Sequence, residues 1–151
     1  MDENGVTGRI ELEPKSIVDS LNGNRFMFSI VAIVSNESDN SIRDVVLNWR
    51  IDNKGIRTVT KDVIVSGDEM SFVLPDRFLN QLDPGLGSRM YSTEESAREA
   101  FQSGAKRLGL IFKFTDIGRR VWQRNLDGSL IGVNTASNVG GTTGAPEIEN
   151  E

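Results

Sequence analysis

Hydrophobic and polar residues alternate one by one along much of this chain, and the pattern is clearest between residues 44 and 52. The apolar residues of this run share one parity: Val45, Leu47, Trp49 and Ile51. The polar residues take the other parity: Asp44, Asn48, Arg50 and Asp52. Since successive side chains of a β-strand point to opposite faces, the run predicts a strand with one buried and one solvated face.

Two further strands are predicted upstream of this run. Ile10 and Leu12 alternate with charged residues and indicate a short first strand, which Pro14 is expected to end. Turn-forming residues follow at 21–24. Residues 26–34 are apolar at both parities, which is typical of a strand in the middle of a sheet.

The chain downstream repeats the alternation after a turn. Residues 52–55 have the composition of a hairpin turn, in which we expect Gly55 to adopt a positive φ, and a return strand is predicted over 56–65. Further strands are predicted at 70–74, 108–114, 119–124 and 130–133, with turns at 67–68, 116–118 and 126–128.

The alternation stops between residues 76 and 107, where a single helix is predicted near 93–103. Ser92 and Glu95 have the spacing of a capping box, in which the hydroxyl accepts from the first free amides and the glutamate reaches back. Three apolar residues then fall on one helical face: Ala97, Ala100 and Phe101. Gly104 is expected to end the helix.

These elements predict an all-β protein. About eight short strands joined by Gly and Asn turns favour an antiparallel sandwich or barrel, and Trp49 suits the core of an immunoglobulin-type domain. We therefore expect an immunoglobulin-like antiparallel β-sandwich with one inserted short helix over residues 1–133. Residues 134–151 are rich in Asn, Thr, Gly and Glu with little to bury, and are expected to be disordered.

Parts of the sequence resemble a known group of proteins. These parts are residues 26–36, 42–45 and 71–75, a turn with Gly67, and the block F-T-D-x-G-R-R-x-W-x-R-x-x-x-G-x-L at 114–130. Over residues 24–131 the chain resembles uncharacterised bacterial, largely actinobacterial, immunoglobulin-like domains, which are often attached to a membrane segment. The resemblance implies the fold and no activity.

The charge of the chain is concentrated at its two ends. The net charge is −5, and five terminal acids account for all of it: Asp2, Glu3, Glu147, Glu149 and Glu151. The remaining body is formally neutral, which argues against binding to nucleic acid. The longest uncharged apolar run, residues 26–36, is too short to cross a membrane, so we expect any membrane attachment to lie outside this chain. Without a cysteine or a secretory signal, the sequence leaves the localisation open between the cytoplasm and a membrane.

The composition also restricts catalysis. The chain contains neither histidine nor cysteine, so it lacks Ser-His-Asp and Cys-His arrangements and imidazole ligands for zinc. No spacing suggests the paired carboxylates of a hydrolase, and the aspartates lack the spacing of a calcium loop. We therefore expect no cofactor, no bound metal and no enzymatic activity. Asn36 begins a formal glycosylation triplet, Asn36-Glu37-Ser38, of a kind that is common by chance.

Two groups of residues are candidate binding surfaces. Arg120, Trp122 and Arg124 share the parity of one strand face. Either the arginines cover a structural tryptophan, or the three side chains form a contact surface, since Trp and Arg are enriched at interaction hot spots. Phe78 and Tyr91 lie in the long irregular connection of residues 76–92, where they either cover the core or bind.

Protein binding is therefore the function that the sequence favours. We expect a non-catalytic interaction or scaffolding domain of a larger bacterial protein, with an unidentified protein as its partner. The alternative is a carbohydrate-binding module, which would need an exposed ring at Trp122 or Tyr91 for stacking on sugars. Open edge strands of the sandwich leave a homodimer as a further alternative.

Overall fold

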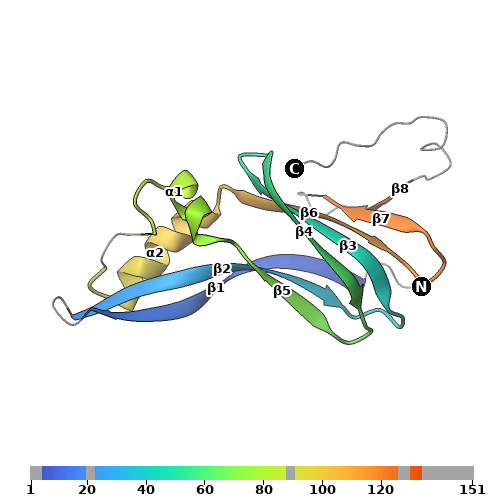
Figure 1. Cartoon of the computed structure of the whole chain (residues 1–151), viewed down its shortest axis with the longest axis horizontal. Helices are drawn as coiled ribbons and strands as arrows, with labels where there is room; N and C mark the ends of the chain where they lie inside the picture. The colour runs from blue at the N-terminus through green and yellow to red at the C-terminus, as the bar shows by residue number, and fades with distance from the viewer. Residues whose placement is uncertain (1–4, 20–22, 88–90, 126–129, 134–151) are drawn as a thin grey trace.

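The computed structural model describes residues 5–19, 23–87, 91–125 and 130–133. Its strands form two antiparallel sheets that pack face to face (Figure 1). The strand order is β1-β2-β5 in the three-stranded sheet and β4-β3-β6-β7-β8 in the five-stranded sheet. The predicted all-β sandwich is confirmed.

The chain crosses between the sheets after β2, β4 and β5. The strands are β1 (Val6–Asp19), β2 (Gly23–Asn36), β3 (Ile42–Ile51), β4 (Lys54–Ile64), β5 (Glu69–Val73), β6 (Leu108–Thr115), β7 (Val121–Arg124) and β8 (Leu130–Val133). The first, second and fifth strands thus share one sheet, while the third, fourth, sixth, seventh and eighth share the other.

The first strand is much longer than its sequence suggests, and Pro14 does not end it. Pro14 lies inside β1, opposite Phe28 of β2. Because β1 is the edge strand of its sheet, it has a free side on which a missing N–H costs no ladder hydrogen bond. The predicted boundary was therefore wrong, since a proline limits a strand only where its N–H is needed for pairing.

The β3–β4 hairpin confirms one prediction and corrects another. The apolar face of β3 is buried as expected, with Trp49 fully inaccessible to solvent. The two-residue turn joins Ile51 to Lys54, and the positive φ angles belong to Asp52 (51°) and Asn53 (67°). Two successive left-handed residues are typical of a type I′ hairpin, which Asn and Asp tolerate. Gly55 is already part of β4 and does not supply the turn.

The connection from β5 to β6 holds more helix than predicted. A 3₁₀ turn (Asp76–Phe78) and a short helix α1 (Leu79–Leu82) precede the expected helix, α2 (Glu94–Ala105). Gly104 lies within α2 and does not end it. A Cβ on Gly104 would lie 3.3 Å from Leu86 and 3.4 Å from Leu82, so this glycine allows close packing between the helices.

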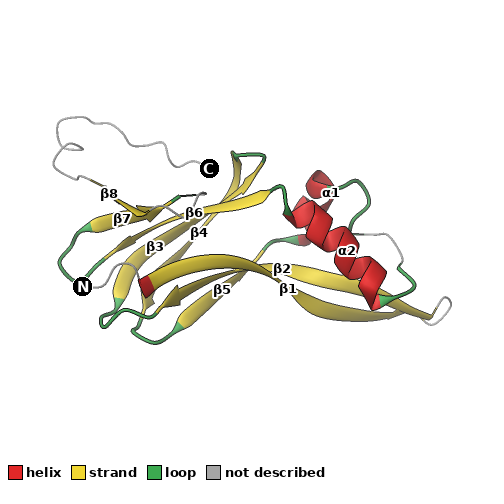
Figure 2. Cartoon of the chain, turned by 180° about the vertical axis from the view of Figure 1, so that it is seen from behind, coloured by secondary structure: helices red, strands yellow, loops and turns green. Residues whose placement is uncertain are grey.

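The helices extend the core beyond the two sheets. Figure 2 shows α2 lying over the half of the β1–β2 hairpin that reaches past the five-stranded sheet. Ala97 and Phe101 of α2 are fully buried, as their shared face predicts, and the Phe101 ring lies 5.7 Å from that of Phe28 in β2. One continuous cluster of buried side chains joins the sheets and helices. The predicted turns at 21–24 and 126–128 fall partly or wholly outside the described residues, as does the predicted tail at 134–151.

Candidate functional site

The three residues of the predicted Arg–Trp–Arg face have different surroundings. Trp122 and Arg124 pair with Phe114 and Phe112, so they share the face of the five-stranded sheet that carries the core. Trp122 is half-buried and packs against that core, and Arg124 donates from Nη2 to the carbonyl of Val6 at 2.8 Å. Each of these two side chains therefore already makes contacts within the fold.

Arg120 differs because it precedes β7 and is exposed. Its guanidinium carbon lies 5.6 Å from the centre of the Trp122 ring, within the range of a cation–π contact. The contacts of the set are those expected when an arginine covers a structural tryptophan. Binding by these three residues stays a prediction.

Phe78 and Tyr91 lie in the core instead of on a surface. Their exposed fractions are 8% and 9%, and the Tyr91 ring meets Phe101 edge-on with 6.4 Å between the ring centres. Arg77 lies over the Phe78 ring at 4.7 Å. Neither ring presents an open face to a ligand, so the structure gives both residues a packing role.

Three connections meet at one end of the sandwich, at the right of Figure 1. They are the β2–β3 loop with the start of β3 (residues 37–44), the β4–β5 turn (65–68) and the end of β6 with the β6–β7 loop (115–120). We call this surface the loop end. Loops presented by a rigid sandwich are common binding surfaces, as in antibody variable domains.

Asn36, which is fully buried, holds two of these connections together. Its Nδ2 donates to the carbonyls of Asn40 and Ile64, both at 2.9 Å. Its Oδ1 accepts from the N–H of Ser38 at 3.1 Å and from the Ser38 hydroxyl at 2.6 Å. The buried amide nitrogen is already engaged, so the formal glycosylation triplet is not presented to solvent.

Asp116, which is 7% exposed, organises the third connection. Its carboxylate accepts from the N–H of Arg120 at 2.9 Å and from Nε1 of Trp122 at 3.0 Å. Burial alone would raise the pKa of Asp116. The hydrogen bonds from Trp122 and from the N–H groups of Arg120 and Gly118, with the Arg120 charge, outweigh burial and lower this pKa below its ordinary value. The carboxylate therefore stays ionised and fixes the loop.

A hollow of about 960 Å³ lies between the three connections. Its lining comes from all three: Asp39, Asn40, Ser41, Arg43, Asp44, Val65, Ser66, Thr115, Asp116, Ile117 and Arg119. Two of these non-glycine residues have left-handed backbones, Asp44 with φ of 50° and Arg119 with φ of 65°. Asp44 lies in a β-bulge, where the pairing of β3 with β6 shifts between Arg43 and Val46. Bulges and unusual backbone conformations are frequent at binding sites.

The rim of this hollow combines apolar and charged groups. Ile117 is 66% exposed and Val65 is 47% exposed. Arg43 and Arg119 are also exposed, and within the described residues neither guanidinium makes a hydrogen bond or an ion pair. The surface can therefore bury an apolar group and offer two cations to a partner.

Sequence reasoning missed this site. It assigned residues 116–118 to a turn, which is correct as local structure. The one available signal was Ile117, a large apolar residue between the turn formers Asp116 and Gly118. The three connections meet because of the way the strands divide between the two sheets. The alternation of hydrophobic and polar residues does not determine this division.

No protein-family model matches the sequence, and no curated protein has significant similarity to it. In the described part of the chain, no three Asp or Glu side chains are grouped as metal ligands, and no helix is long and apolar enough to span a membrane. The resemblance to bacterial immunoglobulin-like domains stays a prediction.

Proposed function

We propose that this chain is a non-catalytic protein-interaction domain that binds its partner through the loop end. The exposure of Ile117 and Val65 beside a large hollow carries this proposal. Among the described residues four large hydrophobic side chains are exposed, and the other two, Val73 and Ile131, lie on strands. Apolar side chains gathered at a concave surface are typical of interaction sites.

The rigidity of the loop end supports the same proposal. Asn36 and Asp116 use buried hydrogen bonds to fix the connections from below, and the Ser66 hydroxyl donates to the Ser38 carbonyl at 2.5 Å. A surface that is already ordered loses less conformational entropy on binding. The free arginines 43 and 119 add side chains of a type that often anchors interfaces.

The remaining parts of the proposal come from the sequence. The absence of histidine and cysteine favours binding over catalysis, and the resemblance favours a place within a larger, membrane-attached bacterial protein. Sugar binding has less support, because Tyr91 is buried and Trp122 is half-buried beneath Arg120. We therefore propose a protein partner.

Substitution of Ile117 tests the proposal. Proteins captured from a lysate of the source organism by the wild-type chain would be identified, and the partner then purified for direct titration. Ile117→Asp is expected to weaken the partner's affinity at least tenfold, because burial of such a side chain contributes about 1.5–3 kcal/mol.

Ile131→Asp is the matched control. Ile131 is also exposed, at 47%, but lies on β8 away from the loop end. It is expected to leave the affinity unchanged. Both variants should first show the wild-type melting temperature. Equal binding by wild type and Ile117→Asp would place the interaction elsewhere, and failure of the wild type to hold any protein would contradict the proposed function.

A further inference from the structure

The free edge of β1 carries main-chain groups that have no hydrogen-bond partner among the described residues. The N–H of Glu37 donates to the carbonyl of Gly5, which therefore points toward β2. The next carbonyl, that of Val6, points the other way and accepts from Arg124. Because N–H and C=O groups alternate sides along a strand, Gly8, Ile10 and Leu12 also present theirs to the free edge. Within the described residues, nothing hydrogen-bonds to these three pairs.

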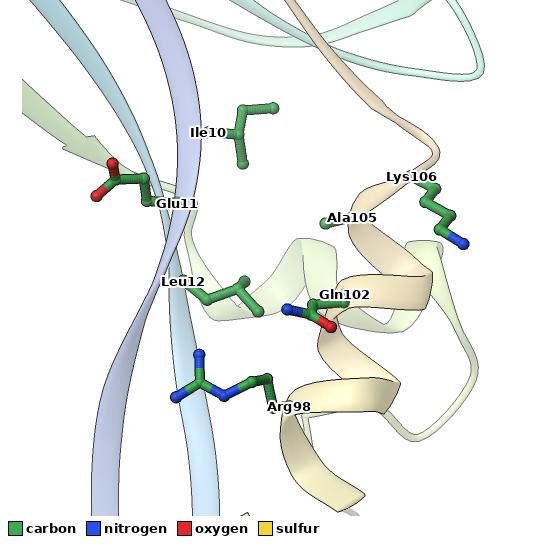
Figure 3. Close-up of a pocket in the computed structure, with 7 residues that line it drawn as sticks. All are labelled: Ile10, Glu11, Leu12, Arg98, Gln102, Ala105 and Lys106. Carbon is green, nitrogen blue, oxygen red and sulfur yellow. The ribbon is translucent and has the colours of Figure 1, made fainter. Parts of the chain in front are cut away.

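This edge lies in a groove. A hollow of about 430 Å³ separates β1 from α2, and one of about 370 Å³ separates β1 from β6 and β7. Ile10 lines both, so the two hollows flank residues 7–12 of β1. Figure 3 shows Ile10 and Leu12 pointing toward α2, whereas Glu11 points to the opposite side of β1. Leu108 and Leu110 add to the apolar floor from β6. We call this surface the β1 groove.

The β1 groove is locally positive in a protein of net charge −5. Three cations line it from α2 and β7: Arg98, Lys106 and Arg124. Arg98 is paired with Glu94 at 2.9 Å, whereas Lys106 makes no ion pair within the described residues. Arg9 also lines it but is paired with Glu11 and Glu69. Arg98 and Gln102 both point from α2 toward β1 (Figure 3). Charge complementarity therefore favours an acidic occupant.

The dimensions suit one extended strand. Residues 7–12 span about 20 Å as a β-strand, the length of a six-residue peptide. The Arg124–Val6 hydrogen bond joins β7 to β1 at one end of this stretch. Of the other edge strands, β5 and β8 are only five and four residues long. The edge strand β4 has eleven residues, but the two hollows described above lie beside β1.

We propose that the β1 groove binds an extended acidic peptide, which pairs with β1 as an added strand. The peptide's main chain would form hydrogen bonds with the outward N–H and C=O groups of Gly8, Ile10 and Leu12. Its inward side chains would cover Leu108 and Leu110, and its acidic side chains would face Arg98 and Lys106. Strand addition with alternating side chains in pockets is an established mode of peptide recognition. This surface is separate from the loop end and does not depend on it.

Selection from a random octapeptide library displayed on phage, with the full chain as target, tests the proposal. We expect enrichment of peptides that combine apolar residues with Asp or Glu. The most enriched peptide would be synthesised and its affinity measured for three proteins. Gln102→Glu should weaken binding at least threefold and Gln102→Lys should strengthen it, because the Gln102 amide points into the groove (Figure 3). Gln81→Glu, an exposed glutamine on α1, is the control and should have no effect.

The peptide backbone provides the second measurement. Two N-methylated peptides would be compared, one methylated at the odd-numbered residues and one at the even-numbered residues. Only the peptide that loses the N–H groups paired with β1 should lose binding. Ile117→Asp should leave peptide affinity unchanged, which separates this proposal from the loop end. Absence of enrichment, enrichment of basic peptides, or full binding by both N-methylated peptides would overturn it. A further result would also overturn it: light scattering that shows a dimer of the wild type and a monomer of Ile10→Pro. A second copy of the chain would then occupy the edge of β1.

Discussion

At the scale of single residues, buried polar side chains shape the loop end more than apolar ones do. Asn36 donates to the carbonyls of Asn40 and Ile64, and Asp116 accepts from the N–H of Arg120 and from the indole of Trp122. Buried polar groups are costly unless they are satisfied, and these two are satisfied by the loops that they hold. The position of Ile117 at the rim therefore depends on Asp116, its neighbour in the chain.

Asp116→Asn is expected to lower the free energy of unfolding by about 1–3 kcal/mol at pH 7, because an amide cannot accept on both sides as the carboxylate does. The pKa of Asp116 in the folded state lies below the ordinary 3.8. Its ionised form therefore contributes stability above about pH 4, and this contribution is lost as the pH falls through the folded pKa.

Urea unfolding of both proteins at pH 7 and at pH 3 measures this effect. The difference in stability between wild type and Asp116→Asn should shrink at the lower pH. Asp39→Asn, on the exposed part of the same surface, should show no difference at either pH. A gap that is equal at both pH values would mean that the charge of Asp116 contributes nothing.

At the scale of elements, alternation predicted which segments are strands, and tertiary contacts decided where they begin and end. The alternating face of β3 and the doubly apolar β2 were predicted from the sequence, because burial on one or both faces leaves a direct record in the residues. The extent of β1 was not predicted from the sequence. Pro14 is tolerated inside this strand because β1 lies at the edge of its sheet. Whether a strand lies at the edge depends on the arrangement of the whole sheet, and the strand's own residues do not indicate it.

The helix α2 shows the same limit at its first residue. The sequence pattern suggested Ser92 as the N-cap, but Thr93 has the extended backbone of a cap and accepts from the N–H of Ser96 at 3.1 Å. The Ser96 hydroxyl bonds back to the Thr93 carbonyl at 3.1 Å. Two adjacent hydroxyl residues both satisfy the local pattern, so the packing of α2 selects between them.

Thr93→Ala is therefore expected to reduce the free energy of unfolding by about 1 kcal/mol, the typical cost of a lost N-cap. Ser92→Ala, one residue earlier, should change it by less than about 0.5 kcal/mol, as an exposed substitution outside such a feature does. Thermal unfolding followed by circular dichroism would compare the two. The reverse order of effects would restore Ser92 as the cap.

At the scale of the whole molecule, the binding surfaces arise where elements distant in sequence meet. Val65 and Ile117 lie in different connections and line one hollow only because the chain crosses between the sheets. The β1 groove likewise needs β1, α2 and β6 together. Residue patterns predicted the fold class, whereas both candidate sites depend on topology, which explains why the sequence pointed to Arg120, Trp122 and Arg124 instead.

The helical layer and the sandwich should also unfold as one unit, because a single buried cluster joins them. Phe101 of α2 is fully buried between Phe28 of β2 and Tyr91, so Phe101→Ala should cost about 3–5 kcal/mol. Phe101→Leu provides a milder change if the alanine variant does not fold. Helix content can be followed by circular dichroism and the sandwich by the fluorescence of Trp49 and Trp122, which both lie in the five-stranded sheet. Coincident transitions that shift together would show that α2 is part of the cooperative core. Loss of helix before loss of the tryptophan signal would instead make α2 a separately folding layer, and the α2 wall of the β1 groove would then be the less stable one.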